Sequence, residues 1–222
     1  MKYGGMPSMI WKIYAKSFGK NLQDVLGFDK HRSSKMTKNA KATYKEIIHR
    51  LPRFEKGDRY LMNSVSCAQL AAFYLQMDKK PSLEKMTEYY DKSMMTSVTR
   101  FFFKLKGRKA FSKSEPASLK ETESRRDGDK NPYSWNMSLE VFENGSGYQT
   151  KFSHCGICYL LTELGIPEII PAMCRLDYAM AEAMGVDFER THTIGGGDAY
   201  CDNNYFKSEK KDIYDEHGKV SY

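Results

Sequence analysis

The hydrophobic pattern of this chain changes at residues 135–141, which read WNMSLEV. Every second residue of this stretch is apolar, and a period of two is typical of a strand with one buried face. The segment 143–147, ENGSG, follows and supplies residues that accept the positive backbone angles of a tight turn. Tyr148, Thr150 and Phe152 then repeat the alternation. The sequence therefore predicts a β-hairpin over residues 135–152.

Upstream of this hairpin the apolar residues recur at helical spacing instead. Pro52 ends the second of these patterns, and Ser82 is placed to cap the fourth. The fourth helix is expected to turn Leu83 and Val98 inward and to run into the aromatic residues 101–103. The expected helices span residues 11–26, 36–51, 61–75 and 83–98.

Downstream of the hairpin the pattern predicts two more helices and a second pair of strands. The helices are expected over residues 156–164 and 167–184, and the strands over residues 188–194 and 199–206, joined by Gly195-Gly196-Gly197-Asp198. The predicted fold class is α+β, with an N-terminal helical layer packed on a C-terminal antiparallel sheet and two crossover helices.

A chain of 222 residues can bury enough surface to form one core, so we expect a single domain over residues 1–222. It divides into a helical half (1–103), a basic connector (104–134) and a β-rich half that carries the site (135–207). The connector has low hydrophobicity and is expected to be a solvated linker.

The net charge of +7 does not indicate a nucleic-acid partner, because much of the excess lies in the connector, which offers few aromatic side chains for stacking on bases. A small anionic substrate would be attracted equally well. The sequence contains no stretch of eighteen or more apolar residues, so we expect no membrane partner. We also expect no secretory leader at the N-terminus. We therefore expect a cytoplasmic protein, and its five cysteines, an odd number, fit free thiols better than disulfides.

Residues 154–158, HCGIC, contain a Cys-x-x-Cys motif at a predicted junction of strand and helix. A thiol at a helix N-terminus has its thiolate favoured by the helix dipole, so Cys155 is a candidate reactive residue. The same motif occurs in disulfide oxidoreductases and zinc sites, but the parallel βαβ unit and the second ligand pair that those sites need are not predicted. The simplest alternative is that Cys155 and Cys158 are buried as small apolar residues.

Cys174 and Asp177 are three residues apart on the next predicted helix and therefore share one face. Asp177 is a candidate for binding a cationic group of a substrate. The alternative is a surface carboxylate or a helix cap.

The predicted strand over residues 188–194 would place Arg190 and His192 on one side. On the neighbouring strand, Cys201 and Asp202 point to opposite sides. A Cys and a His on paired strands suit nucleophilic catalysis, because the imidazole lowers the thiol's pKa and later donates a proton. The three glycines between these strands resemble a phosphate cradle, but a flexible hairpin loop is the simpler interpretation.

Five short motifs in the last third of the chain share their order and spacing with one known family. They are Cys158-Tyr159, Glu163-Leu164-Gly165-Ile166-Pro167-Glu168, Cys174-Arg175-Leu176-Asp177, Phe188-Glu189-Arg190-Thr191-His192-Thr193 and Gly197-Asp198-Ala199-Tyr200-Cys201-Asp202. On these residues the chain resembles the L-2-amino-thiazoline-4-carboxylic acid hydrolase family. The resemblance implies a hydrolase without a cofactor or metal that opens a small cyclic amidine or isothiourea bearing a carboxylate.

The electrophilic carbon of such a ring needs a thiolate or an activated water. We expect Cys201 to be the nucleophile and His192 its partner in proton transfer. Cys155 is the second candidate thiol, and Asp202 is expected beside the amidine nitrogens.

The substrate's amidine and carboxylate need groups of opposite charge. We expect Arg190 to bind the carboxylate and Asp177 to bind the amidine, with Glu163 and Cys174 as further substrate-binding candidates. The chain departs from the family pattern at Asn203-Asn204, where an aromatic residue and an arginine are expected, so a related substrate is also consistent with the sequence.

Two other functions remain open at this point. Helices that precede a β-rich half with scattered cysteines are also similar to sensor domains of the 4-vinyl reductase type, which bind a small molecule without turnover. A cysteine-ligated metal protein is the third hypothesis. A homodimer is a further expectation.

Overall fold

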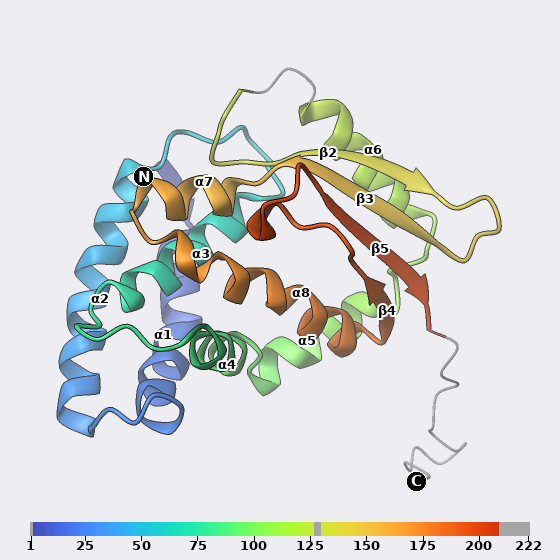
Figure 1. The fold of residues 1–222 in the computed structure, drawn as a ribbon. Coiled ribbons are helices and arrows are strands. Elements are labelled where there is room, and N and C mark those ends of the chain that lie inside the picture. The colour runs from blue at the N-terminus through green and yellow to red at the C-terminus, as the bar shows by residue number, and fades with distance from the viewer. Residues whose placement is uncertain (1, 127–129, 209–222) are drawn as a thin grey trace, which may run out of the picture.

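A computed structural model describes residues 2–126 and 130–208, with a helical layer at one side and an antiparallel sheet at the other (Figure 1). The predicted α+β class and its order, helices first and sheet last, are confirmed. In the described residues, no helix is long and apolar enough to cross a lipid bilayer. The first half comprises the short strand β1 (Lys2–Gly5) and the helices α1 (Met6–Asp24), α2 (Lys30–Arg50), α3 (Leu61–Tyr74), α4 (Leu83–Met94), α5 (Ser97–Gly107) and α6 (Ser114–Arg126).

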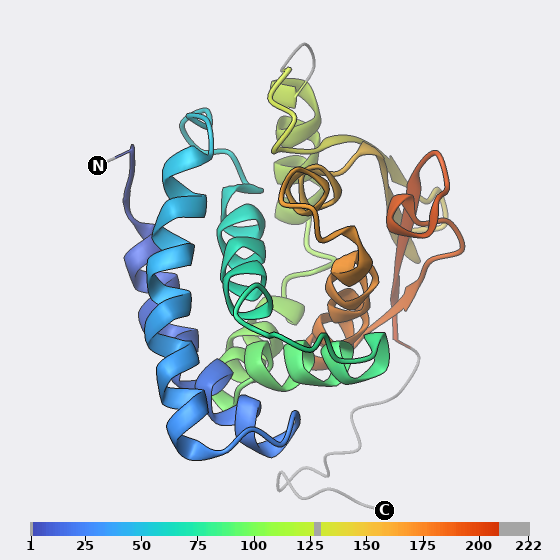
Figure 2. The same ribbon diagram turned by 60° about the vertical axis from the view of Figure 1, so that its left-hand side comes forward.

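Helix α3 is the centre of the helical half, and Figure 2 shows it beside α1 and α2. Its residues from Ser64 to Tyr74 are all buried. Phe73 of α3 stacks on Phe18 of α1 with 5.1 Å between ring centroids, and Tyr89 of α4 meets Phe18 edge-on at 5.5 Å. Aromatic contacts thus join three helices in one core.

The single helix expected over residues 83–98 is two helices. Ser82 caps α4 as predicted. The helix nevertheless ends at Met94, because Thr96 caps a new helix by accepting the backbone N–H of Thr99 at 3.2 Å. A local cap therefore divides the segment 83–98, which the apolar spacing predicted as a single helix.

The inward orientation expected for two apolar residues of this segment is wrong. Leu83 is 45% exposed and Val98 is 59% exposed. The aromatic residues 101–103 belong to α5, and of these only Phe103 packs against the core. The outer face of α5 is therefore apolar and exposed.

The prediction of a solvated linker over residues 104–134 is also wrong. The segment contains the end of α5 and all of α6. Leu119 of α6 is 4% exposed and belongs to a cluster with Trp135 and Tyr148. Most other residues of this helix are polar or charged, so Leu119 alone gave too little apolar periodicity for a helix prediction.

An ion pair fastens the end of α6 to the loop before α3. Arg126 Nη1 lies 3.3 Å from Asp58 Oδ2, and the two side chains are 5% and 1% exposed. Arg126 Nε also donates to the carbonyl of Trp135 at 2.8 Å. This buried contact holds the start of the β-rich half against the helices.

The sheet has the strand order β2-β3-β5-β4, and each strand is antiparallel to its neighbours. The predicted hairpin is confirmed as β2 (Asn136–Val141) and β3 (Gly147–His154). β5 (Cys201–Lys207) pairs with β3, and β4 (Val186–Glu189) lies at the edge.

One face of the sheet packs on helices. Met137 and Tyr148 contact the cluster around α6, and Val186 packs with Ala181 of the helix that precedes β4. Alternate residues such as Lys151 are exposed on the other face. We refer to these as the inner and outer faces of the sheet.

The two helices predicted between the strand pairs are confirmed. They are α7 (Gly156–Glu163) and α8 (Ile170–Met184), separated by the 3₁₀ turn η1 (Pro167–Ile169). α8 runs between the sheet and the helical layer (Figure 1). It ends at Gly185, whose φ of 69° is easily reached only by glycine.

The strand predicted over residues 188–194 stops at Glu189. Residues 190–200 form a loop that contains the 3₁₀ turn η2 (Ile194–Gly196). Carboxylates take the backbone N–H groups that a strand would have used: Asp202 accepts from Thr191, and Asp198 accepts from Thr193. Hydrogen bonds to these side chains thus replace the backbone hydrogen bonds that would join neighbouring strands.

Candidate active site

Thiols from three parts of the chain gather between α8 and the inner face of the sheet. Cys155 precedes α7, Cys174 lies on α8 and Cys201 opens β5. The charges of these sulfurs affect one another's pKa values, and Asp177 of α8 affects the same groups. The fold therefore brings together residues that are 19 and 27 positions apart in sequence.

The surroundings of Cys155 favour its charged form. It occupies the N-cap of α7, where helix N–H groups have no partner within the helix. The neighbouring thiol of Cys158 lowers the pKa of Cys155, and the backbone N–H groups of Cys158 and Ile157 act in the same direction, whereas burial opposes them.

The other thiols have the opposite tendency. The influence of Cys155, together with burial, raises the pKa of Cys158. Burial raises the pKa of Cys67, and it raises that of Cys174 to about 12. Cys201 is 8% exposed, and burial raises its pKa although its sulfur accepts the N–H of Ile194 at 3.2 Å.

The start of α7 is held by a loop that crosses it. A Cβ atom on Gly156 would lie 2.2 Å from the carbonyl oxygen of Tyr133, so only glycine fits there. Ser64 donates to the same carbonyl at 2.8 Å, and His154 Nε2 lies 2.7 Å from the carbonyl oxygen of Pro132. The glycine beside Cys155 thus permits the contact that fixes the position of this cysteine.

Arg190 joins the loop after β4 to α8. Its Nη1 lies 2.7 Å from Asp177 Oδ2, and its Nη2 donates to the carbonyl of Cys174 at 2.7 Å. The side chain of Arg190 is 5% exposed, whereas that of Asp177 is 29% exposed. Burial raises the pKa of Asp177, and the guanidinium opposes that change. The shared helix face predicted for Cys174 and Asp177 is the one that receives this arginine.

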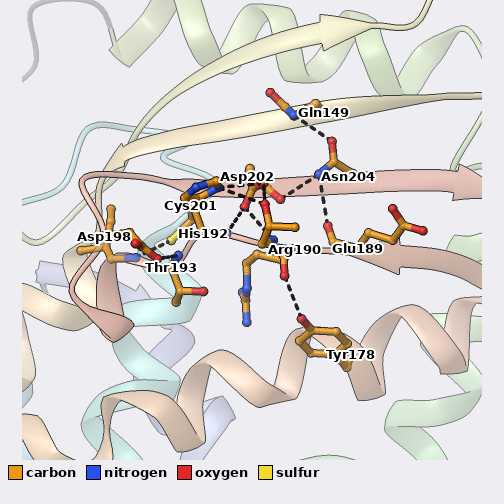
Figure 3. Close-up of polar contacts among 12 residues, drawn as sticks. Gln149, Tyr178, Glu189, Arg190, His192, Thr193, Asp198, Cys201, Asp202 and Asn204 are labelled. Carbon is orange, nitrogen blue, oxygen red and sulfur yellow. Dashed lines mark hydrogen bonds and ion pairs between the residues drawn. The ribbon is translucent and has the colours of Figure 1, made fainter.

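Asp202 and His192 form a separate group, and Figure 3 shows that the guanidinium of Arg190 points away from it toward α8. Asp202 accepts the backbone N–H groups of Thr191 at 3.0 Å and His192 at 2.5 Å. His192 Nδ1 lies 3.4 Å from Asp202 Oδ2, and its ring packs on Tyr200 with 4.7 Å between centroids. Burial disfavours the carboxylate of Asp202, but hydrogen bonds from Thr191 and His192 lower its pKa to about 2.

Cys201 and His192 are therefore placed on different sides of β5. Cys201 pairs across the sheet with Phe152, which belongs to the cluster under the inner face. Asp202, the next residue, pairs with exposed Lys151 and holds His192 on the outer face. The geometry does not bring the imidazole to the Cys201 sulfur as the sequence led us to expect.

Asn203 is a polar residue of the inner face that the sequence did not single out. It is 7% exposed and lies on the same face of β5 as Tyr205. Its Oδ1 has no hydrogen-bond partner among the described residues, and the same is true of Arg190 Nε. Buried polar atoms are nearly always paired, so an unused acceptor and an unused donor indicate a place for a polar ligand. The only signal in the sequence was the departure from the family pattern at this position.

Glu163 lies apart from the other candidates. It is exposed and is the last residue of α7, whose first turn follows Cys155. Eight residues of helix span about 12 Å, so Glu163 and Cys155 are at opposite ends.

The Cys-x-x-Cys motif was also considered as part of a disulfide oxidoreductase or of a metal site. Cys155 follows a strand with antiparallel neighbours, unlike the parallel βαβ unit of disulfide oxidoreductases. Among the described residues, no group of three or more His, Cys, Asp or Glu side chains is arranged to hold a metal ion.

A pocket of about 520 Å³ lies elsewhere, between α1 and α2. Aromatic side chains of Trp11 and Tyr44 and the cations Lys41 and Lys45 line it, but it contains no thiol and no carboxylate. We therefore place the candidate active site by its chemistry, at the thiols between α8 and the sheet.

Comparison with known proteins identifies the family to which the chain belongs. No match was found among curated proteins or among solved structures. A family model described as L-2-amino-thiazoline-4-carboxylic acid hydrolase matches residues 30–205, which include every candidate residue of the site. The chain belongs to the L-2-amino-thiazoline-4-carboxylic acid hydrolase family.

Proposed function

We propose that this protein hydrolyses L-2-amino-thiazoline-4-carboxylate, or a closely related cyclic isothiourea with a carboxylate, and that Cys155 is the nucleophile. The observation that carries the proposal is the position of Cys155 at the N-cap of α7, with the thiol of Cys158 in the first turn, a setting that lowers the pKa of Cys155. A thiolate is the form that attacks carbon, and Cys155 is stabilised in this form while Cys174 and Cys201 are not.

The surroundings of Cys155 complement the remaining groups of such a substrate. The free acceptor of Asn203 and the partly exposed carboxylate of Asp177 suit the N–H groups of an amidine. The free Nε–H of Arg190 suits a carboxylate oxygen. Arg190 and Asp177 thus keep the substrate-binding roles expected from the sequence, although each also binds the other.

The proposed reaction has two steps. The thiolate of Cys155 attacks the ring carbon between nitrogen and sulfur, and the bond from that carbon to the ring sulfur breaks. The ring sulfur leaves as a thiolate and takes up a proton, while the opened substrate stays attached to Cys155 as an isothiourea. Water then adds to the same carbon and the Cys155 sulfur leaves. The net change is addition of one water, which yields a urea and a free thiol.

His192 and Asp202 have a positioning role in this proposal. Asp202 binds the backbone N–H groups of Thr191 and His192, the two residues that follow Arg190. The carboxylate therefore fixes the loop from which the guanidinium reaches α8. This replaces the proton-transfer role that we expected for His192.

Release of thiol from L-2-amino-thiazoline-4-carboxylate tests the proposal. Wild-type protein is expected to release one thiol for each substrate consumed, and Cys155→Ala is expected to lose this activity. Cys201→Ala is the matched control, because it removes a neighbouring thiol whose pKa is raised. Acid quenching during turnover followed by peptide mass analysis should find the isothiourea on Cys155.

The possible outcomes separate the components of the proposal. Activity in folded Cys155→Ala with loss in Cys201→Ala would transfer the nucleophile to Cys201. Saturable binding of the substrate by wild type without thiol release would contradict the hydrolase and favour the sensor function. Far-ultraviolet circular dichroism of each variant shows whether its fold is kept.

A further inference from the structure

The outer face of α5 is an apolar stripe exposed to solvent. Val98, Phe101, Phe102 and Leu105 follow the spacing i, i+3, i+4 and i+7, which places them on one side of the helix. Their exposed fractions are 59%, 59%, 64% and 38%. The rings of Phe101 and Phe102 contact each other edge-on, with 6.2 Å between centroids. Contiguous exposed apolar surface of this kind marks an interaction site.

The opposite side of α5 fixes this orientation. Thr99 is 6% exposed and its hydroxyl lies 3.3 Å from the hydroxyl of Tyr14 on α1. Phe103 packs against the main core, and the helix lies against α8. The apolar stripe therefore cannot turn inward without breaking these contacts. α5 lies at the lower edge of the molecule in Figure 1.

The chain segment that contains α5 is basic. Residues 92–114 contain seven Lys or Arg and no Asp or Glu. Successive residues of a helix are rotated by about 100°, so Lys104 and Arg108 form a row along one flank of the stripe and Lys106 lies along the other. All three side chains, and that of Lys109 just beyond the helix, are exposed.

We propose that α5 binds the surface of an anionic lipid bilayer, lying in its plane with Phe101 and Phe102 inserted among the lipids and the flanking cations at the phosphate groups. Aromatic residues on one face and Lys or Arg beside them are the pattern of helices that lie at a membrane interface. This is binding to a membrane surface and requires no spanning segment.

Charge also decides against a second copy of this chain as the occupant. A symmetric contact through α5 would bring the same cations of both copies together, and like charges at close range repel. An anionic bilayer neutralises them instead. The chain as a whole has a net charge of +7, which acts in the same direction.

Cosedimentation with vesicles tests this proposal on the full-length protein. The probes are vesicles of equal parts phosphatidylcholine and phosphatidylglycerol, and vesicles of phosphatidylcholine alone. Wild type is expected to bind the mixed vesicles, to bind the neutral ones much less, and to be released by added salt. The double variant Phe101→Ser, Phe102→Ser is expected to bind the mixed vesicles about tenfold more weakly or worse.

Ile13→Ser is the matched control, since Ile13 is a 48% exposed apolar residue on α1 outside the stripe, and its binding should equal that of wild type. Because both phenylalanines are exposed, the double variant should keep the wild-type circular dichroism spectrum. The proposal is overturned if wild type fails to bind the mixed vesicles, if it binds neutral vesicles equally well, or if the double variant binds as wild type does. It is also overturned if wild type sediments as a dimer that the double variant converts to a monomer, because the stripe would then be an interface between copies.

Discussion

Arg190 Nη1 lies 2.7 Å from Asp177 Oδ2, so two residues expected to bind opposite ends of a substrate also bind each other. The pair connects the loop after β4 to α8 and stands beside the candidate nucleophile. It leaves Arg190 Nε and part of the Asp177 carboxylate available to a ligand. In the proposed function, one ion pair therefore combines structural support with substrate binding.

Removing one member of this pair should destabilise the protein. In Asp177→Asn the guanidinium of Arg190 remains buried without its counter-charge, and we expect the free energy of unfolding to fall by about 3 kcal/mol. Urea denaturation measures this change. In the double variant Asp177→Asn, Arg190→Gln no buried charge is left without a partner. Its free energy of unfolding should therefore fall by less than the sum of the decreases in the two single variants. Strict additivity would show that the two side chains do not interact.

Cys158 should control the reactivity of Cys155. Its thiol is the largest influence that lowers the pKa of Cys155, so Cys158→Ala should raise that pKa. The rate of alkylation of Cys155 by iodoacetamide would then rise at a higher pH than in wild type. Cys158→Ser keeps a donor and should restore part of the difference. An unchanged profile in Cys158→Ala would mean that the helix N–H groups suffice alone. Peptide mass analysis identifies the alkylated residue, and the measurement is independent of the substrate.

Asp202 should make the free energy of unfolding decrease at low pH. Its pKa is about 2 in the folded protein and 3.8 in the reference state, so its contribution is present above pH 3.8 and is lost as the pH falls toward 2. Asp202→Asn should lower the free energy of unfolding at neutral pH by about 2 kcal/mol, because charged hydrogen bonds to Thr191 and His192 are weakened.

Urea denaturation at neutral pH and near pH 3 measures both effects. The difference between wild type and Asp202→Asn should shrink at the lower pH. Asp187→Asn, at an exposed position of β4, should show neither change. Equal differences at both pH values would contradict the assignment to Asp202.

Gly156→Ala should displace the start of α7. The new Cβ would meet the carbonyl oxygen of Tyr133 at 2.2 Å, so the loop or the helix must shift. We expect a loss of about 2 kcal/mol in the free energy of unfolding and slower alkylation of Cys155. Gly5→Ala is the control, since no atom lies within 4 Å of its added Cβ, and it should change neither quantity appreciably.

Local patterns along the sequence were sufficient for much of the fold. The alternation in residues 135–141 and the turn after it determined the hairpin, and helical spacing located α1 to α4 and α7 and α8. These features depend on neighbours a few residues away. Where a single apolar residue marked the buried face, as Leu119 does in α6, the same reasoning missed the helix.

The family resemblance predicted the family correctly, but the roles that we propose for the candidate residues depend on the tertiary structure. The sequence places Cys155, Cys174 and Cys201 in one third of the chain without showing that their charges affect one another. It also paired His192 with Cys201, whereas the carboxylate of Asp202 holds the imidazole on the outer face.

The sequence by itself determined the α+β class, the positions of most elements and the family. Only the tertiary structure decided which thiols lie together and which charged groups meet. The physical reason is the distance along the chain over which each kind of interaction acts. Periodicity and capping act within one or two turns, whereas a pKa depends on burial and on donors that come from distant segments. Cys155 and Asp177 acquire their properties from such neighbours, and no local pattern encodes them.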